Sequence, residues 1–513
     1  MDLSNQRATR AFLRTAGVSG GVATGTLVEE IETHISVIFL HRDRVLKLKK
    51  AVRFAYLDFS DPQTRLELCR REVDLNKRTA PELYRGVRTI VRRPDGSLAL
   101  DEDGEVVDAV VEMARFEQDA LFSQLALDGR LDDPLLDTLA RRIADFHDSL
   151  PALPGRCGHD AIRRALAANT EAFAATSFAT HPDVSALLAN IERTVEDKKQ
   201  QLESRGRSGR IRRCHGDLHL GNICLFRGQP TLFDCLEFDE DLASIDVLYD
   251  LAFLLMDLWR AGRQQAANRV FNRYLDHTGD TRDLGLMPLY VAMRATIRAH
   301  IAATRADSLA AEKDAAQKAR REAQTHIDLA RESLAARQPR LVAIGGLSGS
   351  GKSTAAAAVA PYTGPIPGAR ILSTDRIRKA LWGADPLTQL PPEAYTPQMS
   401  ERVYEAQRRE TETVIAGGAS VIADGVFLKA AERAAIAQVA DAANVAFNGF
   451  WLEAPESTLV QRVEERRNDP SDATADVVRL QKQNAGNQTD WPQIDAGTTI
   501  GATRDQILRN IDA

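Results

Sequence analysis

The sequence predicts a chain of mixed α+β and α/β class, with an α+β N-terminal part and a C-terminal part built on a parallel α/β sheet. Short strand-like runs and one charged helical stretch occupy residues 1–115, and apolar residues recur at helical spacing from Leu131 onward. Beyond Pro339, apolar strands alternate with helices, as is typical of a parallel sheet. At roughly 100–200 residues per domain, 513 residues are enough for several domains.

Changes in pattern along the chain predict the domain boundaries. We expect a sheet-rich lobe at residues 1–115, a helical lobe at 116–305, a helical linker at 306–339 and the α/β domain at 340–513. The linker is rich in Ala, Lys, Arg, Glu and Gln, which predicts an exposed, solvated helix that ends near a proline.

Composition narrows the class of protein. Apolar residues make up 44% and charged residues 27% of the chain, and the net charge of −6 gives no overall attraction to nucleic acid or anionic membranes. The five cysteines form no Cys-x-x-Cys pair, so we expect buried free thiols in a reducing compartment. The N-terminus has no apolar signal core. Three aspartates interrupt the apolar run Leu242–Trp259, so we expect a buried helix there rather than a membrane span. Together with the cysteines and the N-terminus, this predicts a cytoplasmic protein.

The N-terminal lobe is predicted from short runs. The segments HISVIFL and VLKLKK flank the turn HRDR, which predicts a β-hairpin over residues 33–50. Residues 64–79 have helical spacing, and strands are expected at Val87–Arg92 and Val106–Met113. These elements form a small sheet with one helix.

The most specific motif lies at residues 346–353, where GLSGSGKS matches the pattern G-x-x-x-x-G-K-S/T between an apolar strand and an Ala-rich helix. Its glycines let backbone N–H groups converge on phosphate oxygens, which the positive N-terminal end of the helix also attracts. The lysine reaches the β- and γ-phosphates and the serine ligates Mg²⁺. The motif therefore predicts a site for ATP and Mg²⁺ formed by Gly346, Gly349, Gly351, Lys352, Ser353 and Thr354.

Acidic and basic residues at the ends of the following elements suggest the chemistry of this domain. Asp375 ends the predicted strand ILSTD, and Arg378 lies one helical turn further on. Asp424 ends the strand VIAD, and carboxylates at the C-terminal ends of parallel strands face the ligand crevice. Asp375 is our candidate base for an acceptor hydroxyl and Asp424 our candidate for holding water on Mg²⁺, although these roles can be exchanged. A helix cap and a turn carboxylate are the alternatives.

Arg462 and Arg466 are four residues apart on a predicted helix, which we interpret as a lid that neutralises charge on a transferring phosphoryl group. Ordinary surface arginines are the alternative. Over residues 341–513 the arrangement resembles small P-loop kinases such as gluconate kinase and the polynucleotide 5′-hydroxyl kinases. In the latter, a similar strand-Asp-x-x-Arg element binds the acceptor.

A second motif, HGDLHLGN, begins at His215 and has the spacing of the protein-kinase loop HRDLxxxxN. Asp217 is the expected base, and Asn222 and Asp234 are the expected Mg²⁺ ligands. Glu237 either binds metal or caps a turn.

This motif, followed by a strand ending in Asp, resembles the aminoglycoside and choline phosphotransferase superfamily over residues 30–300. The resemblance implies a protein-kinase-like bilobal domain. It also implies a structural role for Asp250, an orienting role for His215 and an acceptor-facing His219.

A kinase fold needs a strand lysine for the α- and β-phosphates, and Lys47 and Lys49 share one strand face. By analogy with the kinase sequence VAIK we prefer Lys47, with Glu72 as its ion-pair partner and Met113 in the hinge at adenine. A solvated strand lysine is the alternative. Gly17, Gly20, Gly21 and Gly25 do not form the kinase Gly-rich loop, so the turn at Thr33 and His34 is the candidate to cover the phosphates.

The leading hypothesis is a bifunctional ATP-dependent phosphotransferase acting on hydroxyl groups of small molecules. One alternative makes the N-terminal domain a nucleotide-binding regulator. Another makes a nucleic-acid 5′ end the acceptor of the C-terminal domain, which the acidic net charge disfavours.

Overall fold

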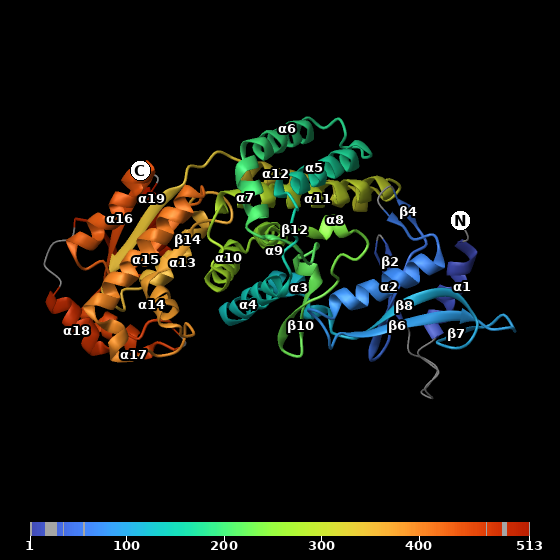
Figure 1. The fold of residues 1–513 in the computed structure, drawn as a ribbon, viewed down its shortest axis with the longest axis horizontal. Helices are drawn as coiled ribbons and strands as arrows, with labels where there is room; N and C mark the ends of the chain where they lie inside the picture. Colours follow the sequence, from blue (N-terminus) through green and yellow to red (C-terminus); the bar gives the residue numbers. More distant parts are fainter. Residues whose placement is uncertain are drawn as a thin grey trace. The chain divides into compact units, whose positions relative to one another are not determined.

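The computed structural model describes residues 3–15, 28–33, 35–54, 57–467, 469–484 and 490–511 (Figure 1). The chain consists of two compact units. The first comprises residues 1–156 and 209–254, and the second comprises residues 157–208 and 255–513.

The first unit contains an antiparallel sheet with the strand order β1-β2-β3-β8-β6-β7. The predicted hairpin is β2 and β3, in which Ile38 lies opposite Lys47, and both later predicted strands are also confirmed. The six strands are β1 (Glu29–Glu32), β2 (Ser36–Leu40), β3 (Arg44–Lys49), β6 (Tyr84–Arg92), β7 (Leu98–Leu100) and β8 (Glu105–Ala114). A separate two-stranded ribbon is formed by β4 (Arg53–Phe54) and β5 (Leu57–Asp58).

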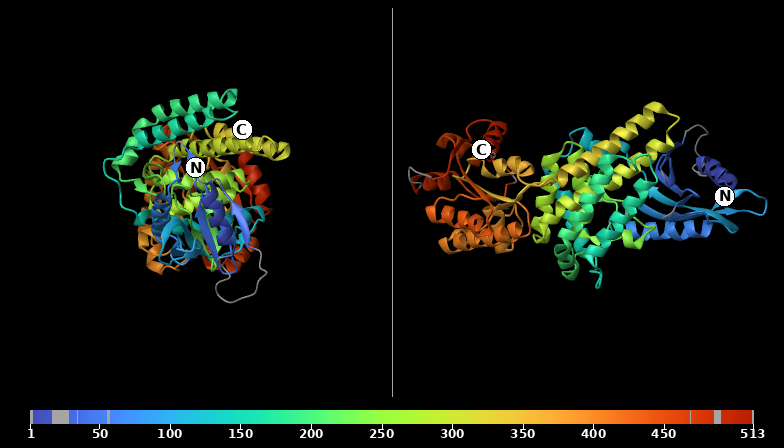
Figure 2. Two further views of the ribbon diagram at one scale, coloured as in Figure 1. Left: turned by 90° about the vertical axis from the view of Figure 1, so that its right-hand side faces the viewer. Right: turned by 90° about the horizontal axis from the view of Figure 1, so that it is seen from above.

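Both faces of this sheet are covered. The predicted helix is α2 (Pro62–Asn76), which packs Leu66, Cys69 and Val73 against one face. A helix that was not predicted, α1 (Leu3–Thr15), lies beside this sheet (Figure 2), and its Leu13 packs into the apolar cluster of the other face. Both faces of the strands are therefore apolar, and the polar strand residues that remain buried need specific partners.

The rest of the first unit carries the loop between β9 (Ile211–Arg213) and β10 (Ile223–Phe226) that holds the second motif. Strand β9 pairs with β12 (Ser244–Asp246), and β10 pairs with β11 (Gln229–Leu232). From Val247 onward the apolar run is buried, as predicted, in α9 (Val247–Arg260), whereas Leu242 at its start is exposed. The other helices here are α3 (Phe122–Leu127), α4 (Asp133–Ser149) and α8 (Glu240–Ala243).

The helices of the second unit correct one expectation. The stretch predicted to be an exposed linker is instead the end of α11 (Met287–Ser308) and a separate helix, α12 (Lys313–Ser333). One face of α12, with Ala319, Ala323 and Ile327, is buried. Small alanine side chains allow close packing, so an Ala-rich charged sequence buries one face while its charges cover the other. The remaining helices of this part are α5 (Gly158–Ala174), α6 (Pro182–Asp197), α7 (Lys199–Arg207) and α10 (Gln264–Thr278).

The C-terminal sheet is fully parallel, as predicted, with the order β14-β15-β13-β16-β17. Its central strands are continuous apolar runs, because both faces are covered by helices. The strands are β13 (Arg340–Gly346), β14 (Arg370–Ser373), β15 (Val421–Asp424), β16 (Ala446–Glu453) and β17 (Gln493–Asp495). The helices are α13 (Lys352–Val359), α14 (Thr374–Trp382), α15 (Pro397–Ala416), α16 (Ala430–Ala443), α17 (Glu456–Glu465), α18 (Ala475–Asn484) and α19 (Ile500–Ile511).

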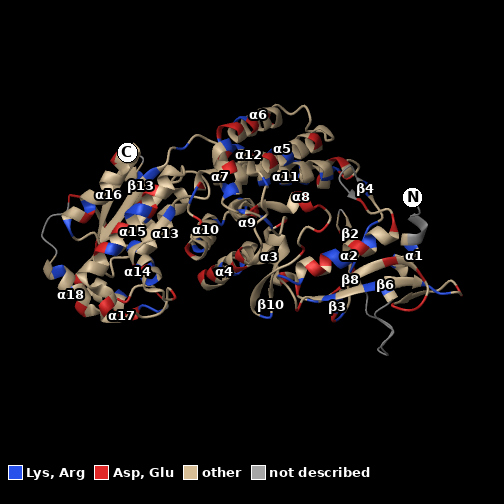
Figure 3. Cartoon of the chain, viewed as in Figure 1, with Lys and Arg blue, Asp and Glu red and all other residues tan. Residues whose placement is uncertain are grey.

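The charged residues and the cysteines are distributed as the composition suggested. Figure 3 shows basic and acidic residues interspersed among the elements. All five cysteines are free thiols, of which Cys157 is half-buried and the others are buried. Within the described ranges, no helix combines the length and the apolar character that crossing a membrane requires.

Candidate active sites

The first site is formed by the loop between β13 and α13. Gly349 and Gly351 adopt φ values of 84° and 87°, a left-handed conformation that glycine reaches without strain. A Cβ atom at Gly349 would lie 2.4 Å from the carbonyl oxygen of Leu459. The glycines that the motif predicts are therefore required by the backbone, which turns sharply into the N-terminus of α13.

Three polar groups meet where this loop enters α13. The Ser353 hydroxyl donates a 2.7 Å hydrogen bond to Oδ2 of Asp424, which ends β15. The Lys352 ammonium donates to the carbonyl oxygen of Leu347 at 3.0 Å. Burial lowers the pKa of Lys352 and raises the pKa of Asp424, and their mutual attraction opposes both shifts. A serine hydroxyl and a carboxylate oxygen are ligands that suit Mg²⁺.

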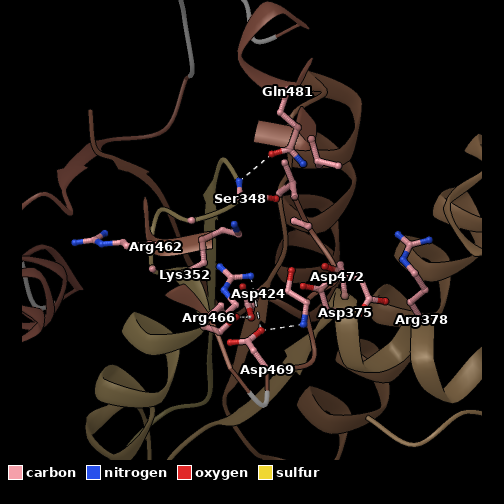
Figure 4. A pocket seen from close by; sticks show the side chains of 18 of the residues that line it. Ser348, Lys352, Asp375, Arg378, Asp424, Arg462, Arg466, Asp469, Asp472 and Gln481 are labelled. Atoms are coloured by element: carbon pink, nitrogen blue, oxygen red, sulfur yellow. Dashed lines mark hydrogen bonds and ion pairs between the residues drawn. The ribbon is translucent and has the colours of Figure 1, made fainter. Parts of the chain in front are cut away.

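Asp375 and Arg378 line the same cavity of about 420 Å³. Strand β14 ends at Ser373, so Asp375 lies in the first turn of α14 rather than at the strand end. Burial raises the pKa of Asp375, and the Lys352 charge partly offsets this effect. The Arg378 guanidinium lies over the Tyr395 ring at 5.0 Å and donates to the Ala394 carbonyl, which directs it to one side of the cavity (Figure 4).

The two predicted lid arginines line the cavity but do not share a helix. Arg462 lies in α17 and donates to the Ala496 carbonyl at 2.9 Å. Arg466 follows the last residue of α17 and has extended backbone angles, so it is not on the helix face that its spacing suggested. Its guanidinium lies 3.8 Å from the Asp469 carboxylate (Figure 4).

Several cavity residues carry no recognisable sequence pattern. Asp472 accepts hydrogen bonds from Lys379 (2.6 Å), from the backbone N–H of Leu390 (3.0 Å) and from the Tyr395 hydroxyl. The Gln481 side-chain oxygen accepts a 2.8 Å bond from the backbone N–H of Ser348 in the phosphate loop (Figure 4). Spacing along the chain gives no signal for these contacts, because each joins segments more than 75 residues apart.

The second site lies in the first unit, around Lys47. Its ammonium group is 2.9 Å from Glu72 Oε1 and 2.5 Å from Asp234 Oδ1. Burial acts to lower the pKa of Lys47, but Asp234 and Glu72 raise it well above its usual value, so the lysine stays charged. Burial also acts to raise the pKa of Glu72, and the two nearby lysines hold it at about 2.

Lys49 lies next to this site and makes contacts that the sequence did not predict. It lies 2.6 Å from Glu72 Oε2, also forms an ion pair with Glu237, and is buried. Burial raises the pKa of Glu237, and the Lys49 charge opposes that rise. Glu237 is therefore bound to Lys49, rather than capping a turn, and Glu72 joins both strand lysines to α2.

The second motif forms a compact loop. The Asn222 amide donates to the Asp217 carbonyl oxygen at 3.0 Å and to its carboxylate Oδ2 at 2.9 Å. His219 Nε2 is 3.4 Å from the same carboxylate oxygen. Asp234 has a φ of 63°, a left-handed conformation that is unusual for a residue with a side chain. Its carboxylate and the Asn222 amide line one cavity, which gives oxygen ligands that suit Mg²⁺.

Asp250, in α9, holds the backbone of this loop in place. Its carboxylate accepts the backbone N–H groups of His215 (3.1 Å) and Gly216 (2.9 Å) and lies 3.1 Å from His147. His215 itself bonds to the Phe233 carbonyl oxygen through Nε2. Both residues thus have the geometry of supports for the loop.

The cavity beside Lys47 has a volume of about 230 Å³ and an apolar interior. Ile31, Val45, Met113 and Phe233 line it together with Thr33, which lies in the turn before β2. This lining can accept a flat base such as adenine. Gly17, Gly20, Gly21, Gly25 and His34 lie outside the described residues.

Comparisons with known proteins match the two sites to two different family models. A model of the phosphotransferase enzyme family matches residues 41–286, and a model of the AAA domain matches residues 341–487. The chain is an ATP-dependent phosphotransferase that combines a kinase-like domain with a P-loop kinase domain. It belongs to the same family as uncharacterized proteins of Mycobacterium tuberculosis and Mycobacterium bovis, to which it is 30% identical over 471 residues, covering 90% of each chain.

Solved structures resemble separate parts of the chain. A putative aminoglycoside phosphotransferase from Ralstonia eutropha aligns with 64% of this chain and 98% of its own (14% identity, TM-score 0.36). A sugar kinase from Janibacter aligns with 34% of this chain and 95% of its own (19% identity, TM-score 0.27). A gluconokinase from Sinorhizobium meliloti aligns with 34% and 98%, respectively (18% identity, TM-score 0.24).

Proposed function

We propose that this protein transfers the γ-phosphoryl group of ATP to hydroxyl groups of small molecules at two separate sites. The observation that supports this proposal is that each unit has its own cavity lined by a lysine and an oxygen ligand pair suited to Mg²⁺, with an aspartate nearby. Among the described residues, both sites contain candidates for the lysine, the metal ligands and the base that phosphoryl transfer uses.

At the C-terminal site, the phosphate-loop N–H groups and Lys352 bind the β- and γ-phosphates. Ser353 and Asp424 hold the Mg²⁺ ion, which neutralises charge on the phosphates when bound. Asp375 accepts the proton of the acceptor hydroxyl, because its carboxylate is not bonded to the metal-binding serine as that of Asp424 is. Arg462 and Arg466 neutralise the charge that develops during transfer.

At the N-terminal site, Lys47 binds the nucleotide phosphates and Glu72 holds it in place. Asn222 and Asp234 hold the metal ion, and Met113 lies against the base. Asp217 accepts the acceptor proton. The ion pair between Lys47 and Asp234 has to separate when phosphate enters. That requirement favours one second candidate function, in which this domain binds nucleotide and regulates the other domain.

ATP turnover by the purified protein against a panel of hydroxyl compounds tests the proposal. The panel contains sugars, sugar acids, aminoglycosides, nucleosides and oligonucleotides, and wild type is compared with Asp217→Asn and Lys352→Ala. Two acceptors that depend on different residues support the bifunctional proposal. Turnover that always needs Lys352 and never Asp217 supports the regulatory alternative, and turnover of oligonucleotides alone argues against a small-molecule acceptor.

A further inference from the structure

A buried polar stripe runs along α10, a helix that lies within the region matched by the phosphotransferase family model. Asn268, Asn272 and Asp276 are spaced four residues apart and therefore share one helix face. The two asparagines are at most 2% exposed. Buried amides are expensive unless they are hydrogen-bonded, so their partners indicate what the stripe does.

The partners of this stripe lie in the P-loop domain. The Asn272 amide donates to the Ala369 carbonyl oxygen (3.2 Å), and its side-chain oxygen accepts the backbone N–H of Ile371 (2.7 Å). The Asn268 amide donates to the carbonyl oxygens of Pro367 and Ala369. Because β14 is the outermost strand of the C-terminal sheet, these side chains satisfy backbone groups that a further strand would otherwise pair with.

Asp276 extends these contacts to the acceptor side of the P-loop site. Its carboxylate is 2.5 Å from Arg370 at the start of β14 and 3.3 Å from Arg376 in the first turn of α14. Burial acts to raise the pKa of Asp276, but the charges of Arg273 and Arg370 outweigh it and lower the pKa. One carboxylate therefore pairs with an arginine at the start of β14 and with the arginine that follows Asp375 in α14.

A second close contact joins the same two regions. The backbone N–H of Gly285 donates to the Gly417 carbonyl oxygen at 2.8 Å. A Cβ atom at Gly285 would lie 2.5 Å from that oxygen, so only glycine permits this approach. The contact of α10 with β14 is thus not an isolated one.

We propose that α10 is a positioning element of the P-loop kinase site, in which Asn272 and Asp276 set the placement of Asp375 and Arg378 toward the acceptor hydroxyl. The inference rests on the proposed function of that site. The inference gives a physical reason for the fusion of the two domains. Helix α10 of the phosphotransferase-type domain covers the edge strand of the P-loop domain's sheet. The C-terminal site therefore depends on this helix, whichever substrates the two sites use.

The test uses the full-length protein with Asp217→Asn to silence the N-terminal site. Asp276→Asn and Arg376→Gln are compared with Asp314→Asn, an exposed aspartate on α12. We measure kcat and KM for MgATP with water as acceptor, and hydrogen exchange of residues 370–382 and 346–353. We expect kcat to fall at least tenfold with KM within twofold of the control, and exchange to accelerate at residues 370–382 only.

Arg376→Gln keeps the test informative if Asp276→Asn does not fold, because it removes one contact without leaving a buried charge unpaired. Asp276→Glu, which keeps the charge, is expected to recover part of kcat. Equal kcat in Asp276→Asn and Asp314→Asn, or a parallel rise in KM for MgATP, overturns the inference. If neither water nor any compound of the acceptor panel supports turnover that depends on Lys352, the proposed function fails. Unchanged exchange at residues 370–382 in Asp276→Asn then overturns the inference separately.

Discussion

The hydroxyl of Ser353 donates a 2.7 Å hydrogen bond to the Asp424 carboxylate, although the two residues are 71 positions apart. This bond brings the end of β15 to the start of α13, directly beside Lys352. The two oxygen atoms therefore meet at the point where we propose that Mg²⁺ would be held.

Asp424→Asn is expected to weaken metal use at this site. Loss of a carboxylate that orients or binds the ion reduces metal affinity by about 10–100-fold. The half-saturating Mg²⁺ concentration for turnover that depends on Lys352 should rise by that factor, while nucleotide binding in EDTA changes little. An unchanged Mg²⁺ requirement with a much lower kcat would instead assign Asp424 the role of base.

Asp375 should determine the acid limb of the pH–rate profile of the C-terminal site. Burial raises its pKa, and a base works only when deprotonated. Turnover should therefore fall, on acidification, at a pH higher than an ordinary aspartate would give. Asp375→Asn is expected to lower kcat by roughly 10²–10⁴-fold. An acid limb that survives in this variant contradicts the assignment.

Glu72→Gln should destabilise the first unit. The substitution leaves Lys47 and Lys49 buried with reduced compensation, and breaking a buried ion pair costs about 3–5 kcal/mol. Glu240→Gln is the matched control, because Glu240 pairs with arginines at a half-exposed surface position, where such pairs contribute about 0–1 kcal/mol. The free energy of unfolding of both variants is measured by urea titration, with hydrogen exchange in β3 and α2 as the local readout. Similar effects of the two substitutions would show that the buried pairs are not structurally important.

Gln481→Ala should increase nucleotide affinity at the C-terminal site. The Gln481 oxygen occupies the backbone N–H of Ser348, a group that faces phosphate in a P-loop. A single hydrogen bond contributes roughly 1 kcal/mol, so the dissociation constant for an ATP analogue should fall about fivefold. Titration calorimetry with Mg²⁺ and the analogue measures this change. Weaker binding would mean that Gln481 contacts the nucleotide directly.

The sequence was informative wherever function lies within one short segment. The loop at 346–353 requires consecutive backbone N–H groups, so its residues are contiguous and recognisable. The same applies to Asp217 and Asn222, which lie five residues apart and are bonded to each other. The sequence was less informative about Arg466, because helical spacing does not reveal that α17 ends one residue earlier.

By itself, then, the sequence determined the fold class, the two phosphate-handling motifs and the parallel character of the C-terminal sheet, because these follow from local periodicity and contiguous backbone geometry. Only the tertiary structure decided which groups meet across long separations: Lys49 with Glu237, Asp472 with Lys379, and the α10 stripe with β14. Such pairs form because buried charges and edge-strand amides need partners, and packing supplies a partner from anywhere in the chain.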